Sequence, residues 1–500
     1  MNQYIQLLGQ CGDKARCPGS TEESLWAALG AGASGLALRI SKTKDGEFIC
    51  APGQIINNES VSVKTSSLTL QQILELDAGA HWSPKGHENT PWAGAGRNRA
   101  IRYISLNRAL QIFGRRSNLC VQLEQSIGSV DDIRSLLHRV AKFGLSERIM
   151  LSGDLEQCAI SRNVDYSGSL LVDLSSYTGI TPAIRDKLSN FAFDMIIVDS
   201  EKLKDVEQSL GSMSTNFSWA VRGTSLNTEV IEKADLVIST DVLTSADSIH
   251  PLSTVFSDRF EGRKIDRSQW TAGYSHANAD TDISQDDGIH IEIKEGGEYS
   301  GAAAVTTVPV HGDFDAIVDY RVENPHQGTT FEMAAIGIDP GYYYINSERL
   351  SGRRVNLTFD VHGAPPYASS ECDENDGHRL GWNNGFNLTK IGDVRADGDK
   401  IEVDAWSASS VNMYNKYRRD VGKGATIGAE GRLRLHRSGS VFAAYYQDCE
   451  TSEWVCSGTA LVQNLADDVF IRLAAKHWKK KNPHPPKNKV SFYNFKLRQR

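Results

Sequence analysis

The chain has 500 residues, of which 40% are hydrophobic and 23% are charged, and its formal net charge at pH 7 is −8. This length predicts two or three domains, and the composition is that of a globular protein with enough apolar side chains for sizeable cores. The acidic balance argues against a nucleic-acid-binding protein and against a polybasic membrane-surface protein, because both need a basic face.

The N-terminus and the apolar segments carry no targeting or membrane signal. No apolar run approaches the roughly 18 residues that a membrane-spanning helix requires. The residues Met1–Leu8 lack the basic start and the long apolar stretch of a secretory signal, so they are interpreted as a first β-strand. We therefore expect a cytoplasmic protein without a membrane span.

From the start to about residue 248, short apolar strands alternate with amphipathic helices. The predicted strands are Ile5–Leu8, Gly35–Ile40, Phe48–Ala51, Leu119–Leu123, Ile149–Ser152, Leu170–Leu174, Met195–Val198, Trp219–Val221 and Leu236–Ser239. The predicted helices are Thr21–Leu29, Asp131–Phe143, Thr181–Leu188 and Leu226–Ala234. This alternation predicts a (β/α)8 barrel. An open doubly wound sheet is the alternative, and the lack of a glycine-rich dinucleotide motif after the first strand disfavours it.

After Pro251 the pattern changes to short alternating strands separated by Gly, Asn and Asp turns. The strands expected here are Ile289–Ile293, Ala316–Tyr320, Val355–Phe359, Ile401–Trp406, Arg432–His436, Phe442–Tyr446, Val469–Ala475 and Val490–Leu497. Many short strands of this kind predict an antiparallel β-sandwich or jelly roll. With Ser245–Pro251 as the linker, we expect domains at residues 1–248 and 254–500.

Several short motifs of the first half occur together in one family of barrel enzymes. They are Gly32-Ala33-x-Gly35, Thr43-Lys44-Asp45-Gly46, Leu68-Thr69-Leu70 with Leu76-Asp77-Ala78-Gly79, Trp219-Ala220-Val221 and Ser239-Thr240-Asp241. On these motifs, about the first 245 residues resemble the glycerophosphodiester phosphodiesterases. The resemblance implies a barrel that cleaves phosphodiesters with two histidines and a divalent cation held by carboxylates.

The positions where this family carries its functional groups hold other residues here. Gln10-Cys11-Gly12 stands at the family's His-Arg-Gly turn, and Ala51 stands at its second catalytic histidine. The family's Glu-x-Asp metal pair falls on Ala37-Leu38-Arg39, and a further acidic ligand falls on Gln122-Leu123-Glu124. A methyl group offers a cation no oxygen and a guanidinium repels it, so we expect neither the metal nor the family's reaction.

The C-terminal ends of the barrel strands form the mouth at which ligands bind in this fold. The candidate ligand contacts there are Gln10, Arg39, Gln122, Glu124 and Trp219. Arg39 could hold an anion through bidentate hydrogen bonds. The alternative, which we favour, is that Arg39 forms an internal salt bridge with Glu124 from a nearby strand.

Three segments of the second half carry a second resemblance. They are Val255–Gly262, Arg432–Gly439 and Val490–Leu497. On these segments, residues 254–500 are similar to the concanavalin A-like lectins and glucanases, which implies a jelly roll whose last strand returns beside the first. Glucanases of this group use a Glu-x-Asp-x-x-Glu strand, whereas Glu402-Val403-Asp404-Ala405-Trp406-Ser407 ends in serine. Glycosidase activity is therefore not expected.

The predicted sandwich carries its own candidate ligand contacts, Trp382, Glu402, Asp404 and Trp406, because aromatic rings stack on sugar faces and carboxylates accept from hydroxyls. No cofactor is predicted. The acidic loops Glu371–Asp376 and Asp397–Asp399 could hold a structural calcium ion, although a solvated loop is the favoured interpretation.

The cysteines are too sparse for a disulfide framework. Cys449 and Cys456 bracket a predicted hairpin tip and could pair in an oxidising compartment, and two reduced thiols are the favoured alternative.

Together these patterns predict a two-domain, non-catalytic binding or assembly protein, with a glycan or a surface polymer as its partner. A hydrolase of the phosphodiesterase or glycosidase class that uses a rearranged active site is the alternative. The sequence leaves a homo-oligomer open. The jelly-roll resemblance makes an extracellular or cell-surface location the alternative to the cytoplasm.

Overall fold

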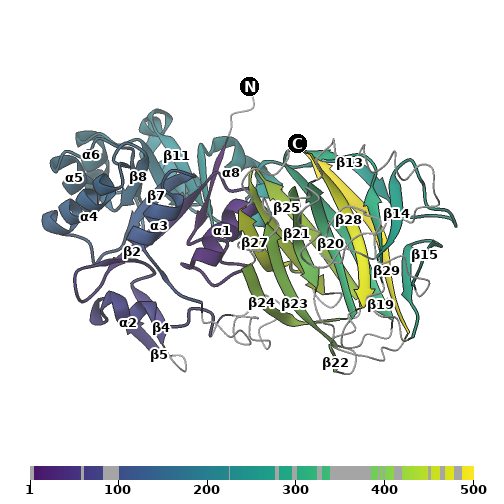
Figure 1. Ribbon diagram of the computed structural model, residues 1–500. Coiled ribbons are helices and arrows are strands. Elements are labelled where there is room, and N and C mark those ends of the chain that lie inside the picture. Colours follow the sequence, from purple (N-terminus) through teal and green to yellow (C-terminus); the bar gives the residue numbers. More distant parts are fainter. Residues whose placement is uncertain are drawn as a thin grey trace. The chain divides into compact units, whose positions relative to one another are not determined.

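The structure is a computed structural model. It describes residues 5–57, 61–80, 82, 101–224, 226–275, 281–295, 301–323, 329–337, 384–391, 395–397, 400–409, 419–428, 430–448, 452–461, 468–477 and 487–500. The chain forms two compact units, and the described residues up to Pro251 belong to the first. Strands alternate with helices in the first unit, and the described part of the second unit is built of strands (Figure 1).

Eight parallel strands of the first unit close into a barrel. They are β1 (Gln6–Gln10), β2 (Gly35–Lys42), β7 (Asn118–Leu123), β8 (Ile149–Gly153), β9 (Leu170–Asp173), β10 (Met195–Asp199), β11 (Ser218–Arg222) and β12 (Leu236–Ser239). The order around the barrel is β1-β12-β11-β10-β9-β8-β7-β2, and β1 also pairs with β2. That last pairing confirms the predicted barrel and rules out the open sheet, which would leave both edge strands unpaired.

Helices connect the strands of the barrel. They are α1 (Glu22–Gly30), α3 (Leu106–Phe113), α4 (Val130–Lys142), α5 (Leu155–Asn163), α6 (Pro182–Asn190), α7 (Leu203–Leu210), α8 (Thr228–Lys233) and α9 (Val242–Ile249), with the 3₁₀ helix η2 (Gly211–Asn216). Side-chain caps begin several of them, since an N-cap oxygen satisfies backbone N–H groups that the first turn leaves unpaired. Thr21 and Asp154 form capping boxes, and Thr181 caps α6 ahead of Pro182.

The barrel interior is an apolar cluster built from alternate strand positions. Its buried members are Leu8, Ala37, Cys120, Leu171, Ile197, Ala220, Leu236 and Ile238, and Met150 and Met195 pack against them. Side chains of a strand alternate between its two faces, so these residues identify the inward face of each strand. The residue two positions further along each strand therefore points inward as well, one level closer to the mouth.

One predicted strand is not part of the barrel. Phe48–Ala51 corresponds to β3 (Phe48–Cys50), which runs antiparallel to β2 because the turn at Thr43–Gly46 reverses the chain. Gly46 has a φ of 78°, a conformation that glycine adopts without strain. The same insertion contains β4 (Gln54–Asn57), β5 (Val61–Lys64), η1 (Thr65–Ser67), α2 (Leu70–Leu74) and β6 (Ile104–Ser105).

The second unit contains two antiparallel sheets. One consists of β13 (Ser253–Asp258), β15 (Thr281–Gln285), β16 (Ile289–Ile293), β19 (Phe314–Glu323), β25 (Glu430–Ser438), β26 (Val441–Asp448), β27 (Val455–Leu461) and β29 (Asn488–Gln499). The other consists of β14 (Trp270–Ser275), β17 (Gly301–Thr306), β18 (Val310–His311), β20 (Thr329–Gly337), β21 (Asn384–Ile391), β22 (Arg395–Asp397), β23 (Lys400–Ser409), β24 (Arg419–Gly428) and β28 (Asp468–His477). The prediction of antiparallel sheets is confirmed, and the jelly roll stays a prediction.

Aromatic side chains fill the second unit. The rings of Tyr320 on β19 and Phe331 on β20 lie 4.7 Å apart, which brings the two sheets together at this point. The indole of Trp270 contacts Phe256, Phe260 and Phe495. As expected, the closing strand β29 returns beside the opening strand β13, and the two pair antiparallel. This pairing ties the first and last strands of the unit together.

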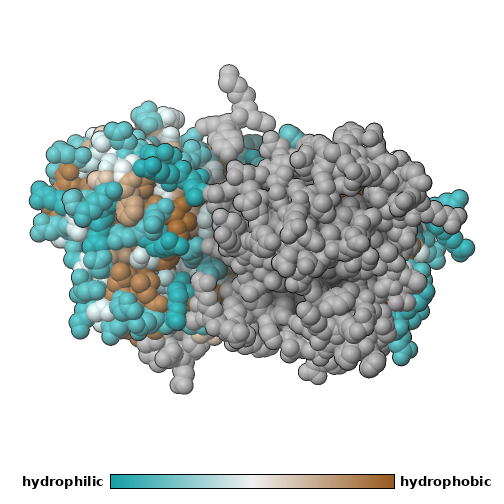
Figure 2. Space-filling model, viewed as in Figure 1, coloured by the Kyte–Doolittle hydropathy of each residue, from teal (hydrophilic) through white to brown (hydrophobic). Residues whose placement is uncertain are grey.

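The visible described surface is mostly hydrophilic. Figure 2 shows hydrophobic residues of the first unit only in small groups among hydrophilic ones. The large hydrophobic side chains that are exposed in the described part are Val130, Val255 and Val308. No helix among the described residues is both long enough and apolar enough to cross a membrane.

Gly35 offers a test of the barrel packing. A Cβ atom at this position would lie 2.3 Å from the backbone oxygen of Asn118 and 2.7 Å from Leu8 Cδ2. We expect Gly35→Ala to lower the free energy of unfolding by roughly 1–3 kcal/mol, as overpacking does in closed cores. Chemical denaturation of the full chain measures it.

Gly179→Ala is the matched control, because no heavy atom lies within 4 Å of its added Cβ. This variant should stay within about 0.5 kcal/mol of the original chain. Equal stability of the two variants would contradict the close approach of β1, β2 and β7.

Candidate functional site

Polar side chains form the level of the barrel interior that lies nearest the mouth. They follow the apolar cluster by two residues on six strands, and neighbouring members pair in register, Arg39 with Gln122 and Asp199 with Arg222. We call them the mouth ring: Gln10, Arg39, Gln122, Asp173, Asp199 and Arg222. Because all eight strands are parallel, their carboxyl ends meet at this rim, where barrel proteins bind ligands.

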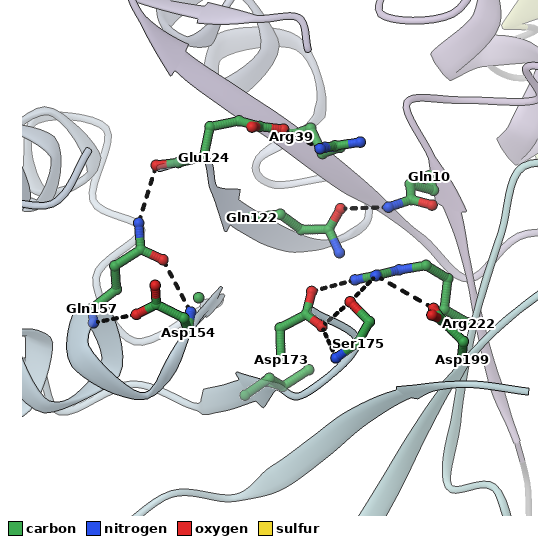
Figure 3. A network of polar contacts seen from close by, with 12 residues as sticks. Gln10, Arg39, Gln122, Glu124, Asp154, Gln157, Asp173, Ser175, Asp199 and Arg222 are labelled. Carbon is green, nitrogen blue, oxygen red and sulfur yellow. Dashed lines mark hydrogen bonds and ion pairs between the residues drawn. The ribbon is translucent and has the colours of Figure 1, made fainter. Parts of the chain in front are cut away.

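Two glutamines form the most buried part of the ring. Gln10 Nε2 donates a hydrogen bond of 3.0 Å to Gln122 Oε1, and the two residues are 8% and 5% exposed. The other end of the Gln122 amide, Nε2, is buried and has no hydrogen-bond partner among the described residues. In Figure 3 this nitrogen points away from Gln10, on the side of the Asp173–Arg222 pair. A buried donor without an acceptor is costly, so this atom needs a partner.

Arg222 lies between two carboxylates at the ends of β9 and β10. Its Nη2 pairs with Asp173 Oδ2, and its Nη1 lies 3.6 Å from Asp199 Oδ1. Nη1 also donates to the Ser175 hydroxyl over 2.8 Å, and that hydroxyl donates to Asp173 Oδ1 over 2.6 Å. The Nε atom of Arg222 is buried and lacks a hydrogen-bond partner in the described part of the chain. The ring thus holds a second unused N–H donor.

Arg39 forms an ion pair with Glu124, which confirms the favoured alternative from the sequence. Glu124 follows β7 directly, and its position is set by Gln157 on α5. Gln157 Nε2 donates to the backbone oxygens of Glu124 and Ile127, at 3.0 and 2.9 Å. The Arg39 guanidinium is therefore held over the rim by a carboxylate that is itself part of the scaffold (Figure 3).

The residues present do not fit the divalent cation that the phosphodiesterase resemblance implies. Ala37 is part of the apolar cluster, and Arg39 brings a positive charge that is paired with Glu124. Hard divalent cations bind several oxygen ligands, most of them charged. Within the described ranges, no group of three or more His, Cys, Asp or Glu side chains is placed to hold a metal ion.

Of the five barrel-mouth candidates predicted from the sequence, four lie together in the structure and one does not. Gln10, Arg39, Gln122 and Glu124 lie together at the mouth. Trp219 does not belong to the ring, because it precedes the inward-facing Ala220 and so lies on the opposite face of β11. It is 6% exposed, and its backbone N–H donates to Asp235 Oδ2.

Sequence reasoning missed three members of the ring, Asp173, Asp199 and Arg222. Each lies at the carboxyl end of a strand that was predicted correctly. A charged residue that directly ends an apolar parallel strand is the signal that could have found them, since such residues converge at one rim of a barrel.

The candidates of the second unit cannot be assembled into a site. Trp382 lies outside the described residues, and so do Cys449 and the acidic segment 371–376. Glu402, Asp404 and Trp406 lie on β23, with backbone partners Thr426, Lys423 and Asp420 on β24. Their side chains are not among those described.

A buried cluster fastens the loop that follows β1. Arg16 Nη1 contacts Asp13 Oδ1 at 3.3 Å and also pairs with Asp241, the N-cap of α9. Arg16 Nη2 donates to Thr244 Oγ1 over 3.2 Å. The pKa of Asp13 is raised to about 6, chiefly by burial and in part by the Asp241 charge, while Arg16 opposes the rise. The loop and the last helix of the barrel are thus joined by charges.

A second buried carboxylate organises the other unit. Asp315 on β19 accepts hydrogen bonds from Arg434 Nε at 2.7 Å and from Arg498 Nε at 2.8 Å. Although burial opposes ionisation, the charges of Arg434, His436 and Arg498 hold the pKa of Asp315 below its usual value. These bonds link β19 to both of its neighbours, β25 and β29.

Comparison with known proteins gives a family match over part of the chain. A family model described as the C domain of a protein of unknown function, DUF1583, matches residues 233–338. No curated protein matches the chain.

Solved structures similar to this chain include glycerophosphodiester phosphodiesterases. The Thermotoga maritima enzyme is 16% identical and has a TM-score of 0.38, covering 50% of this chain and 100% of its own. The Agrobacterium tumefaciens enzyme is 12% identical with a TM-score of 0.36, covering 48% and 100%. An Oleispira antarctica phosphodiesterase in complex with its product sn-glycerol-3-phosphate is 14% identical with a TM-score of 0.39, covering 49% and 96%.

The Asp13 cluster predicts a pH dependence of stability. Its pKa in the folded chain, about 6, lies above the ordinary value of 3.8, so the folded state binds the extra proton in this range. The stability that the neutral form contributes is complete below about pH 4 and is lost as the pH rises through about 6. Relative to Asp13→Asn, the free energy of unfolding should fall by roughly 2–3 kcal/mol between about pH 4 and pH 7.

Denaturation curves of both chains across this pH range measure the difference. Asp186→Asn on α6 controls for the change in net charge, because Asp186 is exposed. A difference between the original chain and Asp13→Asn that stays constant with pH would contradict the raised pKa.

The Asp173–Arg222 pair should contribute measurably to the barrel. The two side chains are 25% and 21% exposed and share Ser175. A double-mutant cycle with Asp173→Ala and Arg222→Ala should give a coupling free energy of about 1–2 kcal/mol in denaturation experiments. The pair Arg108–Glu22, 3.3 Å apart with Arg108 53% exposed, is the control and should give less than about 1 kcal/mol. Equal coupling in both pairs would contradict the assigned network.

Proposed function

We propose that this chain is a non-catalytic binding protein whose barrel takes a small polar ligand at the mouth ring. The observation that carries the proposal is the pairing of Arg39 with Glu124 at the strand position where the resembling enzymes carry metal-binding carboxylates. A guanidinium held there by a fixed carboxylate would repel a cation at this position. At the same mouth, the buried Gln122 Nε2 has no hydrogen-bond partner among the described residues, so a ligand with a hydrogen-bond acceptor would satisfy it.

The chemistry of the ring supports binding over turnover. Its members are two glutamines, two arginines and two aspartates. Hydrolysis of a phosphodiester needs a nucleophile and a group that protonates the leaving oxygen. Both aspartates of the ring face the Arg222 guanidinium, so their carboxylates are already engaged in ion pairs.

For the second unit we propose a concanavalin A-like jelly roll that binds a glycan or a surface polymer. Two antiparallel sheets and the return of β29 beside β13 support this assignment. The candidate contacts are Glu402, Asp404 and Trp406 on β23, together with Trp382. Attachment through this unit would give the whole chain an assembly role.

A hydrolase of the phosphodiesterase or glycosidase class with a rearranged site is the second candidate function. Two carboxylates flank a guanidinium at the carboxyl end of the barrel strands, the end at which barrel enzymes carry their active sites. In that case Arg222 would bind the substrate anion, and Asp173 or Asp199 would act as the general base.

Two measurements distinguish the binding protein from the hydrolase: product release from glycerophosphodiesters, and the change of melting temperature with divalent cations. We expect the purified chain to release no product from glycerophosphodiesters above the protein-free baseline. We also expect no increase of the melting temperature with Mg²⁺ or Ca²⁺, since a cation that does not bind the folded state cannot stabilise it. A glycan array of the full chain tests the second unit.

A bacterial glycerophosphodiester phosphodiesterase, assayed in parallel, is the positive control for both measurements. Product release that is lost in Asp173→Asn or Asp199→Asn would establish the hydrolase and overturn the binding protein.

A further inference from the structure

The charged side chains at the mouth disfavour an anionic ligand. Arg39 is paired with Glu124, and Arg222 is paired with Asp173 and Asp199. These two guanidiniums and three carboxylates leave a formal charge of −1, with each positive group already next to a negative one. A phosphate or carboxylate entering this mouth would be repelled by the carboxylates while the guanidiniums that could attract it are engaged.

The hydrogen-bonding groups at the mouth further restrict the chemical class of the ligand. Gln122 Nε2 and Arg222 Nε are buried donors without hydrogen-bond partners among the described residues, so the ligand must supply acceptors. Asp173 and Asp199 flank Arg222 as carboxylates, so a ligand group that reaches either of them has to be a hydrogen-bond donor. An apolar molecule would offer neither, and an ammonium would offer donors alone. A hydroxyl group offers both from a single oxygen.

The level beneath the ring carries no charged side chain. Under Arg39, Gln122 and Arg222 lie Ala37, Cys120 and Ala220, which are small, weakly polar and fully buried. Small side chains at these positions leave the polar groups above them as the recognition elements. This level therefore adds no charged group that would select a charged ligand.

From these three observations we infer that the mouth ring binds an uncharged polyol or sugar through adjacent hydroxyls. One hydroxyl accepts from Gln122 Nε2 or Arg222 Nε, and its neighbour donates to Asp173 or Asp199. This inference rests on the proposed binding function and specifies the ligand class of the same site.

Titration calorimetry with the full chain tests the inference. The uncharged probes are glycerol, myo-inositol and methyl glucoside, and the anionic probes are sn-glycerol-3-phosphate and inorganic phosphate. We expect at least one uncharged probe to bind and neither anion to compete with it. Gln122→Glu keeps the oxygen that accepts from Gln10 but replaces the free donor with an acceptor. This variant should bind the uncharged probe at least tenfold more weakly.

Gln111→Glu on α3 is the matched control, because it makes the same chemical change on an exposed residue. It should bind like the original chain. Circular dichroism and the melting temperature establish that the Gln122→Glu chain is folded, and Gln122→Ala, which removes the donor without adding charge, should also weaken binding.

The outcomes separate this inference from the proposed function. Binding of the anions alone, unchanged binding by Gln122→Glu, or no binding of any uncharged probe would overturn the polyol assignment. The first two of these results would leave a non-catalytic binding protein in place. Hydrolysis of a diester would instead overturn the proposed function, whichever probe binds.

Discussion

Closure of the barrel is the constraint on which the site depends. Because β1 pairs with β2 as well as β12, the eight parallel strands form a ring, and every second residue of each strand points to its centre. The central level is apolar, and the next level toward the carboxyl ends is polar. If the β1–β2 pairing were absent, β1 and β7 would lie near opposite edges of an open sheet, and Gln10 and Gln122 would be too far apart to bond.

The polar side chains at the mouth are tolerated in the barrel because most of them form an ion pair or a hydrogen bond with another described residue. Arg39 and Arg222 meet carboxylates, Gln10 meets Gln122, and Gln157 fastens the segment that carries Glu124. Buried polar groups are tolerated in a protein interior when they are paired. Gln122 Nε2 and Arg222 Nε are the exceptions, because these two buried donors have no hydrogen-bond partner among the described residues.

Much of the architecture could be read from periodicity and turn residues. Apolar runs located all eight barrel strands, and the change of pattern after Pro251 predicted the antiparallel strands that follow it. Phe48–Ala51 was misplaced, since a short apolar run does not reveal whether it will pair parallel or antiparallel. Trp219 was misassigned for a related reason, because the run does not indicate which of its alternate positions faces the barrel axis.

The linear order of residues predicted the eight barrel strands, the helices capped by Thr21 and Thr181, and the presence of Ala37 and Arg39 on the second strand. Those are local properties, set by propensity, capping and residue identity. The partners of the mouth were settled by three-dimensional folding, because Arg222 and Asp173 are 49 residues apart and Gln10 and Gln122 are 112 apart. Side chains at such separations meet only when the closed barrel brings their strand ends to one rim.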